Sequence, residues 1–357
     1  MRLEASNLPA LARGCAVLGA GGGGDPSLAL VMATLAVEEH GPVRVLAPDE
    51  LSADTLVMAC GFMGAPAVAD ERIWSGDEGR TLRAAVEAHR GGPVGALMPF
   101  QVGGAGGVLP VTWAARMGLA LVDADGMGRA FPGIHQQAMH VAGIGASPVV
   151  LADGRGDTVV VQAAEDARAE RLARSAVGRL GGVCAAALYC MTAADLPTAA
   201  IERSLTLAVE VGEAMAAGGP AERVQAVVGV LGGAVLAEGR VVELEPRVTG
   251  GFAGGSATIH AGGGAPRLRL ELQSEFLLAL EDGAVRAAVP DLICVLASET
   301  GEPVATGALR LGRRVTVIAA PGPDVWRSPA GLALAGPRAF GYDVDHAPAG
   351  QAADGAA

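Results

Sequence analysis

The sequence predicts an α/β protein in which an N-terminal three-layer domain with a parallel sheet precedes a mostly antiparallel β domain. Three observations lead to this prediction. Helical apolar spacing alternates with short unbroken apolar runs over residues 1–165, as in a parallel sheet covered by helices on both faces. Short segments of alternating hydrophobicity, separated by turn residues, dominate residues 219–348. The 357 residues are 51% hydrophobic and 18% charged, enough core for more than one domain.

The N-terminal domain is expected to begin with a helix and then to alternate strands with helices. Asp25 and Pro26 mark one helix start, because an aspartate side chain caps the first amides and proline already has a helical φ. Glycines mark several helix ends. The expected helices are Leu8–Leu18, Pro26–His40, Glu78–Arg90 and Leu109–Met117. The expected strands are Val43–Leu46, Thr55–Cys60, Val94–Met98 and Leu119–Val122, followed by a hairpin of Val149–Ala152 with Thr158–Gln162.

Residues 166–218 are rich in alanine at helical spacing, so we expect a helical segment that packs on the α/β domain. Its helices are expected at Arg168–Leu180 and Thr198–Ala217. The expected strands of the β domain are Arg240–Leu244, Ala257–His260, Leu268–Leu272, Ala284–Ala288, Leu292–Ala297 and Val315–Ala319. Residues 349–357 are small and polar, and we expect a disordered tail there. Exposed β edges would favour a homodimer.

The composition excludes several classes of function. A net charge of −12 with scattered arginines argues against nucleic-acid binding, which needs clustered basic residues. The chain has no lysine, which excludes lysine Schiff bases and a P-loop. Its apolar runs are too short to span a membrane, and its five widely spaced cysteines are typical of reduced thiols. We therefore expect a cytoplasmic protein that binds a small molecule and neither nucleic acid nor membrane.

The glycine-rich segment Gly19–Pro26 is the most unusual in the chain. Its glycines match the dinucleotide fingerprint in form, but that motif follows a strand, whereas the residues before Gly19 predict a helix. We therefore expect no cofactor. Consecutive glycines let a ligand approach the backbone, and the positive end of the next helix points to the same place. The alternative is a glycine turn that only packs a helix against the sheet.

Three further loops follow predicted parallel strands, at Gly61–Pro66, Pro99–Gly107 and Asp123–Pro132. Ligands of open α/β sheets bind beyond the carboxyl ends of the strands, so we expect these loops to share one crevice with the glycine-rich segment. The residues that we expect to bind substrate there are Gly21, Gly22, Gly23, Gly24, Asp25, Met63, Gly64, Gln101, Gly103, Gly104 and His135.

Asp123, Asp125 and Arg129 are the candidate catalytic residues. The two aspartates flank one residue, so in an extended segment both carboxylates leave the same side, and two acids in one site separate each other's pKa values. Arg129 could hold one carboxylate ionised or bind a substrate oxygen. The alternative for this group is an Asx turn with a surface salt bridge.

Histidines and cysteines give no metal or nucleophile signal. His135 and His140 are five residues apart, which places them on different faces of a helix rather than on the shared face of a metal pair. We therefore expect no metal site. Cys60 ends a strand without a histidine near it in sequence, which favours a buried, inert thiol.

Motifs along the chain resemble those of a known family. They are LGAGGGGDP (18–26), GFMGAP (61–66), VDADGMGRAFP (122–132), PDLI (290–293), TGEP (300–303), LRLGRRVTV (309–317) and GPRAFGYD (336–343). In this order they resemble the S-methyl-thiohydantoin desulfurase family, whose genes often stand beside hydantoinase or oxoprolinase subunits. The resemblance implies an α/β domain followed by a mostly β domain, and hydrolytic removal of methanethiol from a 2-methylthio-imidazolone ring.

Under this resemblance we expect Asp123 or Asp125 to act as the base. Arg129 and the glycine-loop amides would stabilise charge. Any of four polar residues in the matched motifs of the second domain could close over the substrate, namely Glu275, Asp291, Arg338 and Asp343. The alternative for these four residues is a set of interdomain or turn salt bridges.

The chain departs from the family pattern at three positions. Where the family pattern resembles E-I-G-G-x-N, this chain has Gln101 and Ala105 in place of the glutamate and the asparagine. Where the family pattern resembles Gln-Asn-Glu, this chain has Ser274 in place of the asparagine. These changes leave three alternatives open: a hydrolase or lyase on a small hydantoin-like ring, a repurposed cyclase, isomerase or dehydratase, and a non-catalytic binding subunit of a hydantoinase-type complex.

Overall fold

The N-terminal half of the chain folds around a mixed sheet. The computed structural model describes residues 1–72, 74–249 and 252–349. The sheet order is β1-β2-β5-β4-β3-β9-β7-β8, with β10 paired to β3, and the four strands β2, β5, β4 and β3 are parallel. The strands are β1 (Arg2–Leu3), β2 (Val43–Leu46), β3 (Leu56–Gly64), β4 (Val94–Pro99), β5 (Ala120–Val122), β7 (Val149–Ala152), β8 (Thr158–Val161), β9 (Val183–Ala187) and β10 (Met191–Thr192).

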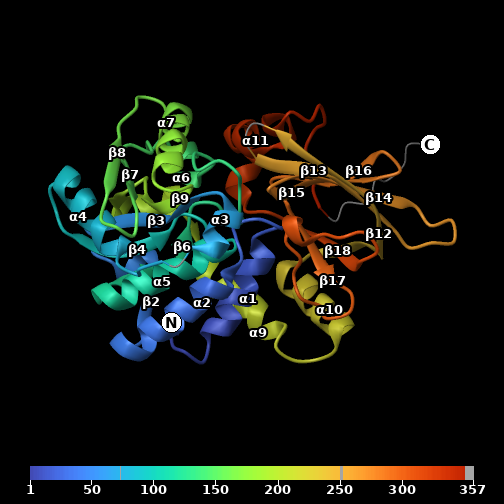
Figure 1. Ribbon diagram of the computed structural model, residues 1–357, viewed down its shortest axis with the longest axis horizontal. Helices are drawn as coiled ribbons and strands as arrows, with labels where there is room; N and C mark the ends of the chain where they lie inside the picture. The colour runs from blue at the N-terminus through green and yellow to red at the C-terminus, as the bar shows by residue number, and fades with distance from the viewer. Residues whose placement is uncertain (73, 250–251, 350–357) are drawn as a thin grey trace.

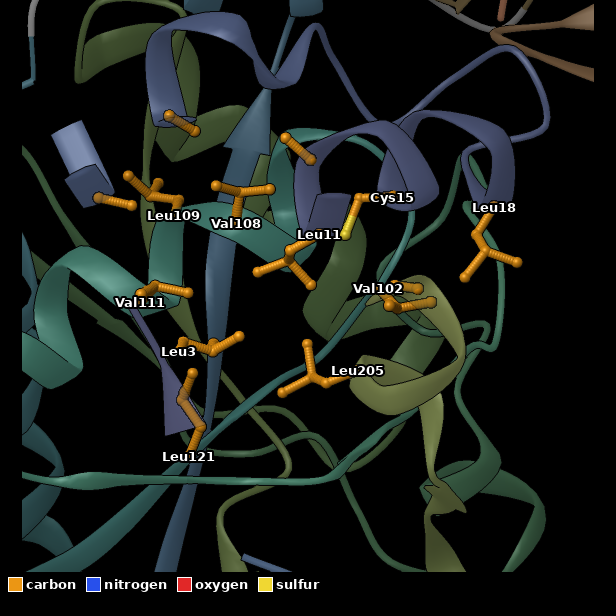
Figure 2. Packing of buried hydrophobic residues seen from close by; sticks show 14 of the residues in the cluster. Leu3, Leu11, Cys15, Leu18, Val102, Val108, Leu109, Val111, Leu121 and Leu205 are labelled. Carbon is orange, nitrogen blue, oxygen red and sulfur yellow. The ribbon is translucent and has the colours of Figure 1, made fainter. Parts of the chain in front are cut away.

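Helices cover both faces of this sheet. In β3 the side chains of Val57 and Ala59 enter one apolar cluster, and those of Met58 and Cys60 enter another on the opposite face. The helices on the face of Met58 are α1 (Leu8–Leu18), α2 (Pro26–His40), α4 (Glu78–Arg90) and α5 (Ala105–Met117). On the other face lie α6 (Ala138–Val141), α7 (Asp166–Arg179) and α8 (Leu196–Ala199). Leu11 and Cys15 of α1, Val108 of α5 and Leu205 pack together in Figure 2.

The C-terminal half forms an antiparallel sheet in the order β16-β15-β14-β13-β12-β18-β17, which curves into a half-barrel. Its strands are β12 (Ala234–Thr249), β13 (Phe252–His260), β14 (Arg267–Gln273), β15 (Glu275–Glu281), β16 (Ala284–Ala288), β17 (Leu292–Ala297) and β18 (Arg314–Ala320). Figure 1 shows this sheet beside the N-terminal domain. The predicted fold class, an α/β domain followed by an antiparallel β domain, is confirmed.

Shorter elements connect these parts. They are η1 (Pro48–Glu50), α3 (Pro66–Glu71), β6 (Ala124–Asp125), η2 (Ala193–Asp195), β11 (Ile201–Glu202), α9 (Ser204–Ala214), α10 (Pro220–Leu231), η3 (Thr306–Ala308), η4 (Asp324–Arg327), α11 (Pro329–Ala335) and η5 (Pro337–Phe340). None of the helices in the described part of the chain combines the length and hydropathy that crossing a bilayer requires.

Three sequence predictions about these elements are wrong. Residues 183–187, predicted within a helical segment, form β9, because their alanines fit between β3 and β7 in the middle of the sheet. The loop predicted at Gly61–Pro66 is strand as far as Gly64, since β9 pairs with it. The single helix predicted over Thr198–Ala217 is divided into α8, β11 and α9.

The end of the chain returns to the N-terminal domain. Trp326 of η4 donates from Nε1 to the carbonyl oxygen of Met127 at 2.9 Å, and its ring lies 5.1 Å from that of Phe131. Ala349, placed at the start of the predicted disordered tail, donates its amide to Asp291 Oδ2 at 2.7 Å. The rest of that predicted tail, residues 350–357, lies outside the described residues. The segment after the antiparallel sheet is therefore bound to the N-terminal domain at Trp326.

Candidate functional site

The glycine loop, residues Gly19–Gly24, lies between the two domains. It follows α1, as the sequence predicts, and turns with positive φ at Gly21, Gly23 and Gly24. Thr306 donates its amide to the Gly21 carbonyl at 2.9 Å, and Phe276 donates to the Ala20 carbonyl at 2.8 Å. The loop is therefore hydrogen bonded to η3 and β15 of the second domain.

Glu275 at the start of β15 packs against this loop. A methyl group on Gly22 would place its carbon 2.2 Å from Glu275 Oε1, so a larger residue at this position would displace the Glu275 side chain. Glu275 is 3% exposed, and its Oε2 has no hydrogen-bond partner among the described residues. Burial raises the pKa of Glu275 to about 8, although the charge of Arg129 opposes the shift. At neutral pH this side chain is therefore mostly a carboxylic acid.

The loop after β4 forms a second wall. Gln101 is 8% exposed and donates from Nε2 to the Gly103 carbonyl at 3.1 Å. A methyl group on Gly23 would lie 2.4 Å from the Gly103 oxygen, so the two loops touch through their backbones. Gly104 adopts a positive φ and N-caps α5. The structure thus brings together the predicted residues of the glycine loop, Gln101, Gly103, Gly104 and Glu275.

A small pocket adjoins the end of the glycine loop. It holds about 20 Å³ and is lined by Gly24, Asp25, Phe62, Trp74 and Ala105, among others. Asp25 accepts from the Ser27 amide at 2.7 Å and caps α2, as predicted from sequence. The N-termini of α2 and α5 both open here, which favours negative charge. The pocket has room for a water molecule, and a larger ligand would require Phe62 or Trp74 to move.

Arg129 joins the two domains from a fully buried position. Its guanidinium donates to the carbonyl oxygens of Phe276 at 3.1 Å and of Asp291, and Nε donates to Ala130 at 3.0 Å. Burial lowers the pKa of Arg129, while the charges of Glu275, Cys294 and Asp291 act in the opposite direction. With its donors on backbone carbonyls, Arg129 positions β15 and provides positive charge beside Glu275.

The structure does not bring Asp123 and Asp125 into one acid–base site. Asp123 accepts from the Thr206 amide at 2.9 Å and from the Thr206 hydroxyl, so it caps α9. Asp125 Oδ2 accepts from the amides of Val102, Met127 and Gly128 at 2.8–3.1 Å. Burial raises the pKa of Asp125 to about 7, and these amide bonds oppose the shift. The Asp125 bonds to Met127 and Gly128 match the Asx-turn part of the alternative interpretation, whereas no salt bridge of either aspartate is found among the described residues.

Three more predicted residues also lie away from the glycine loop. Met63 is a buried core side chain of β3, and Gly64 has a φ of +147° against the backbone of Gly182 and Val183. His135 lies on the other face of the sheet, where Tyr189 donates its hydroxyl to Asp166 at 2.7 Å and to the His135 carbonyl at 3.4 Å. Burial lowers the pKa of His135, against the charge of Glu170.

An open groove of about 620 Å³, which the sequence does not predict, includes Arg72, Trp74, Arg155 and Arg179 in its lining. Arg155 lies in a hairpin turn and Arg179 ends a helix, positions at which arginine carries no sequence signal for a site. Only the folding of β7, β8 and α7 around the end of β3 brings these residues together.

Two family models cover almost the whole chain. The S-Me-THD-like N-terminal domain matches residues 6–163, and the S-Me-THD-like C-terminal domain matches residues 164–349. The chain belongs to the S-Me-THD-like family. This membership confirms the resemblance seen in the motifs and suggests an enzymatic, S-Me-THD-like function.

A solved relative shares the fold of this S-Me-THD-like protein. The X-ray structure of a protein from Chromobacterium violaceum superposes with a TM-score of 0.79, at 23% sequence identity, over 98% of this chain and 99% of that chain. Comparison with curated proteins gives no match. The shared fold therefore extends over both domains.

Proposed function

We propose that the protein is a hydrolase or lyase that acts on a small hydantoin-like or S-methyl-thiohydantoin-like ring at the junction of its two domains. The observation that carries this proposal is the Glu275 carboxyl group, which is buried, lacks a partner at Oε2 in the described structure and lies against Gly22. Membership of the S-Me-THD-like family supports the substrate class.

The environment of Glu275 suits general acid–base catalysis. Its pKa, raised to about 8 chiefly by burial, keeps a proton available at neutral pH. Arg129 limits this shift and steadies the carboxylate that forms when the proton leaves. The Gly23 and Gly24 amides have no backbone acceptor within the described residues, and they stand at the N-terminus of α2. They can therefore donate to an oxygen that develops negative charge.

The reaction follows from these groups. Glu275 protonates a ring nitrogen, which makes the carbon between nitrogen and sulfur electrophilic. Water adds to that carbon and gives its proton to the Glu275 carboxylate, so a C–O bond forms. Glu275 then gives its proton to sulfur as the C–S bond breaks and takes the proton of the new hydroxyl group, so that methanethiol leaves, the C–O bond becomes a carbonyl and the ring is a hydantoin. Substrate and water are thus converted to hydantoin and methanethiol without a redox step.

Because Gln101 stands where the family pattern has a glutamate, the proposed reaction uses one acid–base group, Glu275. Because Gln101 donates to the Gly103 carbonyl, a glutamate there would lose this bond and add a second carboxyl group beside the glycine loop. The double variant Gln101→Glu/Ala105→Asn restores the family pattern. If it releases more methanethiol than wild type, this result would support descent from a desulfurase site. If the double variant gains no methanethiol release and loses another reaction that wild type catalyses, this result would support a repurposed enzyme.

The test is turnover by the purified protein. A panel of 2-methylthio-imidazolones with different ring substituents is incubated with wild type and with Glu275→Gln, and released thiol and hydantoin are both quantified. We expect turnover by wild type and a loss of at least about 100-fold in the variant, the usual contribution of a general acid–base group. Absence of turnover across the panel, or full activity of Glu275→Gln, would contradict the proposal.

A further inference from the structure

Asp291 stands in the short connection between β16 and β17 and is fully buried. Its Oδ1 accepts from the Gly322 amide at 2.8 Å, and Arg327 lies 3.7 Å from the same atom. Its Oδ2 accepts from the Ala349 amide at 2.7 Å and contacts His346 Nε2 at 3.2 Å. The carboxyl group thus joins the start of β17 to the segment after β18 and to the end of the described chain.

The backbone of this connection is held from two further sides. A methyl group on Gly322 would lie 2.6 Å from the Pro290 oxygen and 3.4 Å from the Asp291 Cα atom, so the loop after β18 packs directly on it. Val289 donates its amide to the Leu277 carbonyl of β15 at 2.8 Å. The side chain of Asp291 and these two neighbours together fix the backbone between β16 and β17.

The Asp291 carboxyl group is ionised in spite of its burial. Burial raises its pKa, but the hydrogen bonds of His346, Gly322 and Ala349 together outweigh burial and lower the pKa below its ordinary value. A buried carboxylate is tolerated where donors satisfy it, and removing those donors is costly. At neutral pH Asp291 is therefore a charged anchor and not a titrating group.

The carbonyl group of Asp291 binds Arg129 of the N-terminal domain. Arg129 donates to this carbonyl through Nη1 and to the Phe276 carbonyl through Nη2 at 3.1 Å. Phe276 directly follows Glu275 in the chain. Because a guanidinium group is planar, two bonds to fixed carbonyls set its orientation. The position of the Asp291 carbonyl thus decides where the positive charge lies relative to Glu275.

Three ionisable groups act on the charge of Arg129, namely Glu275, Cys294 and Asp291. Burial raises the pKa of the Cys294 thiol to about 12, against the charge of Arg129, so the thiol is neutral at physiological pH. Glu275 is mostly protonated there, since burial raises its pKa to about 8. Of these three groups, Asp291 is therefore the one that is negatively charged beside the guanidinium.

We propose that Asp291 is a positioning residue for the Glu275 acid, because its anchored carboxylate holds the backbone carbonyl that binds Arg129 and so keeps the guanidinium beside Glu275. The catalytic role of Glu275 rests on the proposed function, whereas the positioning of Arg129 rests on the contacts of Asp291. A loosened anchor lets the guanidinium move away, and the pKa of Glu275 then rises further because less positive charge opposes its burial.

The experiment compares Asp291→Ala with Asp291→Asn in the full-length protein. Both substitutions remove the charge, whereas asparagine alone keeps an oxygen that accepts from a backbone amide. Carbon-13 NMR titration of the glutamate carboxyl groups measures the Glu275 pKa, and the absence of one signal in Glu275→Gln identifies it. We expect the Glu275 pKa to be higher in Asp291→Ala than in Asp291→Asn by at least about 0.5, a fraction of the effect of an adjacent arginine.

A second pair of variants leaves Asp291 in place. Ala349→Pro removes the amide that donates to Asp291, whereas Ala349→Ser keeps this amide and is the matched control. We expect a smaller rise of the Glu275 pKa in Ala349→Pro and no change in Ala349→Ser, and this pair decides the question if Asp291→Ala does not fold. Equal Glu275 pKa values within each pair would show that the anchor only stabilises the fold, and would overturn the proposal.

Thiol release separates this inference from the proposed function. The NMR titration needs no substrate, so absence of thiol release would reject the hydrolase while the pKa comparison still decides the role of Asp291. If thiol is released, its rate should fall as pH rises through the Glu275 pKa, and the fall should come at a higher pH in Asp291→Ala than in Asp291→Asn. Thiol release with the same pH dependence in both variants would overturn the proposal.

Discussion

Glu275 and Gly22 come from different domains and are in direct contact. The carboxyl oxygen of Glu275 stands 2.2 Å from where the Cβ atom of any larger residue at position 22 would lie. Because the φ of Gly22 is not in the left-handed region, this contact and not the backbone conformation is what requires glycine. The glycine loop is thereby fitted to a buried acid, which gives the loop a role beyond a tight turn.

The buried acid should give the protein a pH-dependent stability. The folded pKa of about 8 lies above the ordinary glutamate pKa of 4.5, so between these pH values the folded chain holds a proton that the unfolded chain has lost. This stabilisation is complete below about pH 4.5 and is lost as pH rises through about 8. We expect the free energy of unfolding to fall less between pH 5 and 8 in Glu275→Gln than in wild type, measured by urea denaturation. Glu213→Gln, an exposed glutamate in α9, should keep the wild-type slope. An unchanged slope in Glu275→Gln would contradict the assignment.

The contact at Gly22 can be measured by a double-mutant cycle. Gly22→Ala should lower the free energy of unfolding by about 1–3 kcal/mol, because the new methyl group overlaps the Glu275 side chain. In a Glu275→Ala background the same methyl group enters vacated space, so we expect the two free-energy changes to be non-additive by more than about 1 kcal/mol. Gly229→Ala in α10, with no atom within 4 Å of the new carbon, should instead be stabilising. Additive effects would show that the two side chains do not share space.

The aspartates after β5 should affect stability rather than chemistry. Asp123→Asn should cost about 1 kcal/mol, since it weakens the cap of α9, and should leave turnover within about twofold. Asp125→Asn can place an NH₂ group, a donor, opposite the backbone amides that now donate to the carboxylate. We therefore expect the free energy of unfolding to fall by about 1–3 kcal/mol. Urea unfolding and thiol release measured on the same samples separate the two effects. Loss of turnover in Asp123→Asn at unchanged stability would restore the acid–base interpretation.

Arg129 should contribute strongly to the stability of the domain junction. Arg129→Met leaves the Phe276 and Asp291 carbonyls without donors and removes the positive charge nearest to Glu275, so we expect a loss of about 3–5 kcal/mol. Chemical denaturation followed by tryptophan fluorescence would measure this loss, because Trp326 lies at the same junction. A change below about 1 kcal/mol would show that the guanidinium is dispensable.

The sequence predicts the ends of α1, α2 and α4 correctly because glycine or proline marks their boundaries. It misses β9, whose residues Val183–Ala187 have the alanine content of the helices around them and become a strand only between β3 and β7. It also misses β15, where the apolar run after Glu275 shows no alternation because the strand is buried.

The candidate site shows a similar division. The glycine loop and the loop after β4 are predictable, since both follow the positional rule for open α/β sheets. The pairing of Asp123 with Asp125 is not found, because backbone amides compete for each carboxylate and spacing in sequence does not reveal them. The contact of Glu275 with Gly22 depends on how the two domains pack, and local sequence holds no information on it.

The most direct test of the central claim is a crystal structure of Glu275→Gln with a bound hydantoin. We expect a ring between the glycine loop and residue 275, with a ring oxygen within hydrogen-bond distance of the Gly23 or Gly24 amide and with Phe62 or Trp74 moved from its present position. A ring bound elsewhere, for instance beside His135 and Asp166, with the glycine loop still closed on residue 275, would show that Glu275 is not the catalytic acid.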